Sequence, residues 1–315
     1  VRVDHSRYAD SRWYTGSGIY RDVWLIAAPE IHLAQWGTSW HATSLTNRQA
    51  TIAVDMEVQK HIATNDRLEL SATLYDAAGK QVAQRCTRVS DGKEGITKEN
   101  LTLKITNPHR WNLDDPYLYT LKTELLSNGQ RIDGCETKVG LRTLKFDPNK
   151  GFALNDDWMK VKGVCLHHDA GVLGAVVPPE VWERRLNNLK EIGVNAIRMS
   201  HNPQAPVVYD LCDRLGLLIM DEASDEWEFP KRKWVKGWNK GEPAYDGSFD
   251  FFEEWIEQDV TDMVRRDRNH PSIFMWSIGN EVDYPNDPYS HPILDGSTIN
   301  QPMFGGYKPD APDAM

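Results

Sequence analysis

The sequence lacks the patterns that mark several common protein classes. Four cysteines occur in 315 residues, and they show neither a CxxC pair nor metal-ligand spacing with histidine, which argues against a zinc site or a disulfide framework. The sequence contains no block of lysine or arginine, and its net charge of −10 disfavours nucleic acid or an anionic membrane as the main partner. No apolar run approaches the length of a membrane span. We expect a globular protein with buried free thiols at Cys86, Cys135, Cys165 and Cys212.

The two ends of the chain also lack expected features. The sequence begins with Val1, inside the apolar run "VRV", rather than with methionine or a leader peptide. Residues 282–315 are rich in proline and glycine and show no helix or strand period. We therefore expect a chain truncated at both ends, and the sequence predicts no cellular compartment. The sequence is also compatible with a homo-oligomer.

Tryptophan, by contrast, is abundant, with 12 residues. Its flat apolar face suits stacking on a sugar ring, so this enrichment mildly favours a carbohydrate or another ring-shaped ligand. Most of these side chains are nevertheless expected to lie in the core.

Strand patterns fill the first 143 residues. The runs "VRV" and "IYRDVWLIAA" are apolar, β-branched or aromatic, and predict the last strands of a β domain over residues 1–33. Residues 34–143 contain about seven short alternating segments, with turns at Ala78-Gly79 and Asn128-Gly129. This spacing predicts an antiparallel sandwich of immunoglobulin type.

From residue 144 onward, strands alternate with helices. Amphipathic helices are predicted over residues 178–193, 205–216 and 249–267, and apolar strands over residues 158–164, 194–199, 217–221 and 272–278. Apolar strands separated by amphipathic helices indicate a parallel sheet built from βαβ units. A (β/α)₈ barrel and a doubly wound sheet both fit, although no glycine-rich phosphate motif follows the first strand.

Polar side chains follow all four predicted strands. In chain order they are His167 and His168, then Arg198 and His201, then Asp221 and Glu222, and finally Asn280 and Glu281. The carboxyl ends of barrel strands form one rim, where barrel enzymes carry their chemistry. The pattern therefore predicts a functional site on this rim.

Six segments, in this order along the chain, resemble glycoside hydrolase family 2, the group of β-galactosidases, β-glucuronidases and β-mannosidases. They are "SRWYTGSGIYRDVWL", "NPHRWNLDDPYLYTL", "VGLRTLKFDPNKGFALNDDWMKVKGV", "KGVCLHHDAG", "NAIRMSHNPQAPVVYDLCDRLGLLIMDEA" and "NHPSIFMWSIGNE". The resemblance implies the end of a jelly-roll sugar-binding domain over residues 1–33, an immunoglobulin-like sandwich over 34–143 and the first half of a TIM barrel over 144–315.

The resemblance further implies a retaining exo-β-glycosidase that releases terminal β-D-galactosides from oligo- or polysaccharides. Such an enzyme uses a general acid/base and a nucleophilic carboxylate about 5 Å apart. Glu281 matches the acid/base, and Asn280 matches the amide that binds the sugar 2-hydroxyl. The nucleophile is expected beyond Met315. A β-glucuronidase or β-mannosidase of the same family stays open, as does a non-catalytic carbohydrate-binding protein.

Further site residues follow from the same resemblance. His167 and His201 match positions that contact the sugar ring, and Arg198 matches the arginine that orients the nucleophile. Asp10, or Arg12 beside it, is expected to reach the site from the jelly roll.

The resemblance also raises the question of a metal. Some family members bind magnesium with a Glu-x-His pair after the third strand, where this chain has Glu226 and Glu228. Glutamate can bind magnesium, but the missing histidine disfavours the ion, so we expect no required cofactor. Asp221 and Glu222 are expected to hold the rim together rather than to contact substrate.

Overall fold

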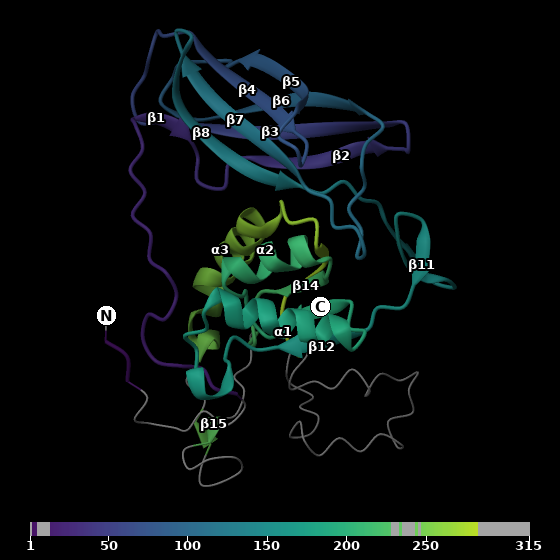
Figure 1. The fold of residues 1–315 in the computed structure, drawn as a ribbon. Helices are drawn as coiled ribbons and strands as arrows, with labels where there is room; N and C mark the ends of the chain where they lie inside the picture. The colour runs from purple at the N-terminus through teal and green to yellow at the C-terminus, as the bar shows by residue number, and fades with distance from the viewer. Residues whose placement is uncertain (1, 5–12, 228–232, 235–242, 245–246, 283–315) are drawn as a thin grey trace.

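The computed structural model describes residues 2–4, 13–227, 233–234, 243–244 and 247–282. In Figure 1 a β-sandwich lies above a smaller unit in which helices cover a parallel sheet. Asp10, Arg12, Glu228 and the segment after residue 282 lie outside the described residues.

Two antiparallel sheets form the sandwich. The first contains β1 (Ile31–Leu33), β2 (Ser39–Leu45), β3 (Gln49–Lys60) and β6 (Gly95–Thr106), and the second has the order β5 (Gln81–Arg88), β4 (Leu68–Tyr75), β7 (Tyr119–Ser127) and β8 (Gln130–Val139). Asn128 and Gly129 join β7 to β8 with φ angles of 51° and 83°. Two consecutive left-handed residues are the signature of the tight hairpin turn that Asn-Gly favours, so this turn was correctly predicted.

The sandwich core follows the alternation of the strands. Ile52, Val54, Met56 and Val58 of β3 are completely buried, as are Leu70 and Leu74 of β4. Inward-facing apolar residues from both sheets thus form one cluster, and the predicted sandwich is confirmed.

The segment before β1 differs from its prediction. The run over residues 19–28 forms no strand, and Trp24 and Leu25 are 80% and 98% exposed. A strand needs a neighbour for its N–H and C=O groups, and within the described part of the chain no segment pairs with it. The first strand among the described residues is β1, which pairs with β3.

A small antiparallel sheet connects the two units. It has the order β11 (Asp157–Met159), β10 (Gly151–Leu154) and β9 (Leu144–Asp147). The single strand predicted over residues 158–164 is therefore wrong, because the chain leaves this sheet at Met159 before it enters the next at Gly163.

The second unit is a parallel sheet of β12 (Gly163–Leu166), β13 (Ala196–Met199), β14 (Leu218–Glu222) and β17 (Ile273–Ser277). Its longer helices are α1 (Pro179–Glu191), α2 (Pro206–Leu215) and α3 (Phe252–Asp267), and its short elements are η1 (Gly171–Leu173), η2 (Ser248–Phe251), β15 (Lys233–Trp234) and β16 (Pro243–Ala244). The strands lie side by side in chain order. This order fits the start of a barrel, whereas a doubly wound sheet reverses direction at a switch point.

Sequence signals fix where these helices begin and end. Proline occupies the first position of α1 and α2, where its missing N–H costs no hydrogen bond. Gly216 ends α2 with a φ of 73°, and a Cβ there would lie 2.3 Å from the carbonyl oxygen of Leu113. None of the described helices is long and apolar enough to cross a membrane.

Charged and polar contacts join the sandwich to the helices. Arg265 of α3 donates to Glu57 at 2.6 Å, the Trp111 indole donates to the Asp213 carbonyl at 2.8 Å, and Arg268 donates to the Trp36 carbonyl at 2.8 Å. These bonds hold the half-barrel against the sandwich.

The cysteines are free, as predicted, but only Cys212 is buried. The predicted burial of Cys86, Cys135 and Cys165 is wrong. Cys86 and Cys135 occupy solvent-facing positions of β5 and β8, and Cys165 lies exposed in β12.

Candidate active site

Glu222, at the end of β14, is the centre of the rim. Its side chain is fully buried and accepts hydrogen bonds from Arg198 Nε at 2.8 Å, His201 Nδ1 at 2.7 Å and Ser277 Oγ at 3.0 Å. The donors come from β13, the residues just after it, and β17. One carboxylate thus links three of the rim segments.

The charge of Glu222 is stabilised despite its burial. Burial alone would raise the pKa of this carboxyl, but the hydrogen bonds from His201 and Arg198 outweigh it and lower the pKa below its ordinary value. For Arg198, burial opposes the charge, and the bonds to Glu222 reverse the effect and raise its pKa. The two groups therefore form an ion pair at neutral pH.

Asn280 is fixed in the same network. The guanidinium of Arg198 donates from Nη2 to Asn280 Oδ1 at 3.0 Å, and Asn280 Nδ2 donates to Asp225 Oδ1 at 3.2 Å. The backbone N–H of Asn280 donates to the Ser224 carbonyl at 2.8 Å. The amide is buried and held in one orientation.

Glu281 follows directly and differs from its neighbour. Its side chain is exposed, and its φ of 53° is a left-handed conformation that non-glycine residues rarely adopt and that clusters at functional sites. The rim therefore places a fixed amide directly before an exposed acidic residue.

Three aromatic rings line the rim next to this network. Trp13 stacks on His167, with ring centroids 4.5 Å apart and an interplanar angle of 14°. It meets His201 edge-on, with ring centroids 5.5 Å apart. His167 and His201 are 5.3 Å apart. Burial, followed by the neighbouring His201, lowers the pKa of His167, so its ring is neutral at neutral pH.

Most of the predicted site residues come together. The Arg198 guanidinium donates to Asn280, and Glu222 accepts hydrogen bonds from both Arg198 and His201. The ring of His167 contacts the ring of His201, and Glu281 follows Asn280 in the chain. The roles inferred for them stay predictions, and so does the role of Asp10.

Three residues of this arrangement were not predicted: Trp13, Asp225 and Ser277. Asp225 lies in the polar run after β14, so a search of strand ends could have found it. Trp13 contacts a histidine far away in the sequence, and only its place beside Asp10 and Arg12 in "ADSRWY" pointed to it.

Behind the rim lies a second buried acid, Asp221. Tyr209 donates its hydroxyl to Asp221 Oδ1 at 2.7 Å. Burial and the nearby charge of Asp267 raise the pKa of Asp221 to about 7. Arg266 donates to both oxygens of Asp267 at 2.7 Å.

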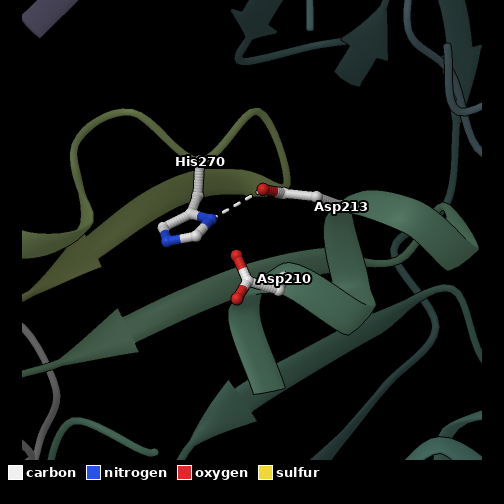
Figure 2. Close-up of side chains that lie close together, drawn as sticks. All are labelled: Asp210, Asp213 and His270. Carbon is white, nitrogen blue, oxygen red and sulfur yellow. Dashed lines mark hydrogen bonds and ion pairs between the residues drawn. The ribbon is translucent and has the colours of Figure 1, made fainter. Parts of the chain in front are cut away.

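One group among the described residues brings three potential metal ligands together: Asp210, Asp213 and His270. Figure 2 shows His270 turned toward Asp213, with Nδ1 2.6 Å from Oδ2. Burial opposes the imidazolium charge, but Asp213 outweighs it and raises the pKa of His270. Metal binding needs a neutral imidazole, and the raised pKa favours the imidazolium instead. We therefore interpret the pair as an ionic clamp between α2 and the turn before β17, at the end of the sheet opposite the rim.

The magnesium question stays open on this geometry. Glu226 is buried and belongs to no such group of three in the described residues. Its potential partner Glu228 lies outside them.

Comparisons with known proteins place the chain in a family. Residues 32–142 match the family model "Glycosyl hydrolases family 2", and residues 148–292 match "Glycosyl hydrolases family 2, TIM barrel domain". The chain belongs to glycoside hydrolase family 2. The predicted family, and the succession of a sandwich and the start of a TIM barrel, are thereby confirmed.

Individual family 2 relatives cover most of the chain. The β-galactosidase BoGH2A of Bacteroides ovatus is 45% identical over 286 residues, which are 90% of this chain and 32% of the relative. A β-glucuronidase of Bacteroides fragilis is 30% identical over 278 residues, 86% of the chain and 38% of the relative.

A solved family 2 structure from Bacteroides cellulosilyticus superposes with a TM-score of 0.78 at 35% identity. The match covers 87% of this chain and 35% of that one. The chain thus spans about a third of the length of these family 2 proteins.

Proposed function

We propose that this chain supplies the acid/base side of the active site of a retaining exo-β-glycosidase that releases terminal β-D-galactosides from oligo- or polysaccharides. The observation that carries the proposal is the double contact of Arg198, at 2.8 Å to Glu222 and 3.0 Å to Asn280. This contact fixes the residue before Glu281 on the rim, while Glu281 itself remains exposed.

In the proposed reaction, Glu281 first donates its proton to the glycosidic oxygen as the bond to the anomeric carbon breaks. It then removes a proton from the water that attacks the same carbon. The two histidine rings and the Asn280 amide would bind the hydroxyls of the terminal sugar, because imidazole and amide groups form hydrogen bonds with hydroxyls.

The mechanism also needs a second carboxylate, about 5 Å from the first, to attack the anomeric carbon. Glu222 is unsuited to attack, because it is fully buried and bonded to Arg198 and His201. We infer that the nucleophile comes from a part of the full-length protein that corresponds to the remaining length of its relatives. Arg198 would help to orient it.

The name of the 45% identical relative favours a galactoside. The second candidate is a β-glucuronide, because the B. fragilis relative is named a β-glucuronidase. A β-mannosidase would retain the same acid/base, and a non-catalytic carbohydrate-binding protein would bind sugar without turnover.

A substrate panel tests the proposal in the full-length gene product. We expect nitrophenyl β-D-galactoside to be hydrolysed with a higher kcat/KM than the corresponding glucuronide and mannoside. On an unactivated galactoside, whose leaving group must be protonated, Glu281→Gln should lower kcat/KM about 100-fold or more, whereas the exposed Glu254→Gln in α3 serves as the matched control and should change nothing. Binding without turnover of any of the three would contradict a glycosidase.

Metal dependence is tested in the same assay. We expect kcat/KM to be unchanged by EDTA and by added magnesium, because the histidine of the Glu-x-His pair is absent and Glu226 is buried. A loss of activity in EDTA that magnesium alone restores would contradict this expectation.

A further inference from the structure

A segment of the N-terminal region crosses the rim. In Figure 1 the purple chain runs from β1 down the side of the half-barrel. The carbonyl of Thr15 accepts from His168 Nε2 at 3.0 Å, Tyr20 stacks on His168 at 5.4 Å, and Arg21 donates to the Pro203 carbonyl at 3.0 Å. Residues 13–21 are therefore attached at several points, and Trp13 occupies a fixed place among them.

Trp13 contacts two side chains of the candidate sugar site. Its ring lies nearly parallel to His167, 14° from coplanar, and its edge approaches His201 at 64°. Both are preferred geometries for aromatic pairs. One indole thus restrains two histidines that come from different strand ends.

The two histidines depend on this contact in different ways. His201 is also held by Glu222, through the bond of 2.7 Å at Nδ1. Nδ1 of His167, in contrast, is buried and has no hydrogen-bond partner in the described structure. The stack on Trp13 therefore covers one face of a ring that lacks a hydrogen bond at this nitrogen.

We propose that Trp13 is a positioning residue for His167 and His201, and that the site requires its aromatic ring rather than its bulk. The inference rests on the proposed function, because the histidines matter for catalysis only if they hold the terminal sugar. In consequence, the N-terminal segment would complete the sugar-binding side of the rim. A misplacement of about 1 Å in such a site can lower the rate about 100-fold.

The test compares two substitutions of Trp13 in the full-length gene product, using whichever of the three nitrophenyl glycosides it hydrolyses. Trp13→Leu keeps an apolar side chain without a ring, and Trp13→Phe keeps a ring. We expect Trp13→Leu to lower kcat/KM about 10- to 100-fold, with part of the loss in kcat, and Trp13→Phe to recover kcat/KM to within about threefold of wild type.

A neighbouring stack provides the matched control. Tyr20 lies on His168 at the same interplanar angle of 14°, within the same segment. Tyr20→Leu should lower the Tm but keep kcat/KM within about twofold of wild type, because His168 bonds to the backbone of Thr15 rather than to the network around Glu222.

Two results would overturn the inference: wild-type kcat/KM in Trp13→Leu, or equal losses in Trp13→Leu and Trp13→Phe. Both are distinguishable from a failure of the proposed function. If the proposed function is wrong, Glu281→Gln will have no effect on kcat/KM. If Glu281→Gln is inactive but Trp13→Leu is fully active, only the role of Trp13 is refuted.

Discussion

The sandwich and the rim of the half-barrel are both densely buried, but they bury opposite kinds of side chain. Leu103 and Leu125 in the sandwich and Glu222 on the rim are all fully buried. The leucines lose apolar contact with water, which stabilises the fold by roughly 1.5–3 kcal/mol per side chain. The carboxylate loses its hydration, which costs free energy unless every lone pair finds a donor.

The difference shows which region of the fold fixes the orientation of individual side chains. Apolar packing in the sandwich accepts many residues of similar volume. The rim depends instead on particular donors, namely Arg198, His201 and Ser277 on Glu222. Such a network contributes little net stability, but it holds each member in one position. Substitutions in the two regions should therefore separate stability from activity.

The largest effect is expected on the rim, from Glu222→Gln. An amide would keep the shape but leave the guanidinium of Arg198 without its counter-charge. Breaking a buried pair costs about 3 kcal/mol, and we expect kcat/KM to fall about 100-fold or more. Urea unfolding and steady-state kinetics measure both. A variant of wild-type activity would contradict the central place of Glu222.

The corresponding change in the sandwich is Leu103→Ala. It removes a completely buried side chain of β6 and should lower the free energy of unfolding by about 2–5 kcal/mol. Because Leu103 lies in the sandwich core and not at the rim, kcat/KM per folded molecule should stay at the wild-type value. A specific loss of activity at a temperature where the variant is folded would break the comparison.

A third prediction concerns Asp221, the buried acid behind the rim. Its pKa of about 7 exceeds the ordinary 3.8, so its contribution to stability is complete below about pH 4 and is lost as the pH rises through 7. Asp221→Asn mimics the protonated form. We expect it to be close to wild type at about pH 3.5 and about 4 kcal/mol more stable at pH 8, because each pKa unit is worth about 1.4 kcal/mol. Equal pH dependence of the unfolding free energy in both proteins would contradict the raised pKa.

The smallest effect is expected at the junction of the two regions, from Arg265→Ala. The hydrogen bond from Arg265 lowers the pKa of Glu57 from 4.5, so its stabilisation is present above about pH 4.5 and is lost as the pH falls. We expect a loss of about 1 kcal/mol at pH 7 that shrinks at pH 3, measured by chemical unfolding. A loss that is independent of pH would point to packing rather than charge.

Local patterns were sufficient to predict most of the fold. Alternation predicted β3 and its neighbours, and the period of α1 correctly placed Trp182 and Leu186 in the core. The same reasoning failed for residues 19–28. Strand propensity describes one segment, whereas a strand exists only with a partner to bond to.

The candidate site was predictable only in part. The rule that barrel strands end on one rim placed Arg198, His201, Asn280 and Glu281 together. It could not show that Glu222 is the carboxylate on which they converge, nor that Asp225 bonds to Asn280. It also could not find Trp13, because a ring contact over so long a sequence separation leaves no local pattern. Which side chains contact one another is decided by the tertiary fold.

The most direct test of this account asks whether Glu281 donates a proton to the leaving group. It compares kcat/KM of wild type and Glu281→Gln in the full-length gene product on two galactosides. One has a dinitrophenyl leaving group, which departs without protonation, and the other is an unactivated disaccharide. The account predicts a loss of about 100-fold or more on the disaccharide and a loss of less than about tenfold on the dinitrophenyl substrate. Equal losses on both substrates would contradict the assignment of Glu281 as the acid.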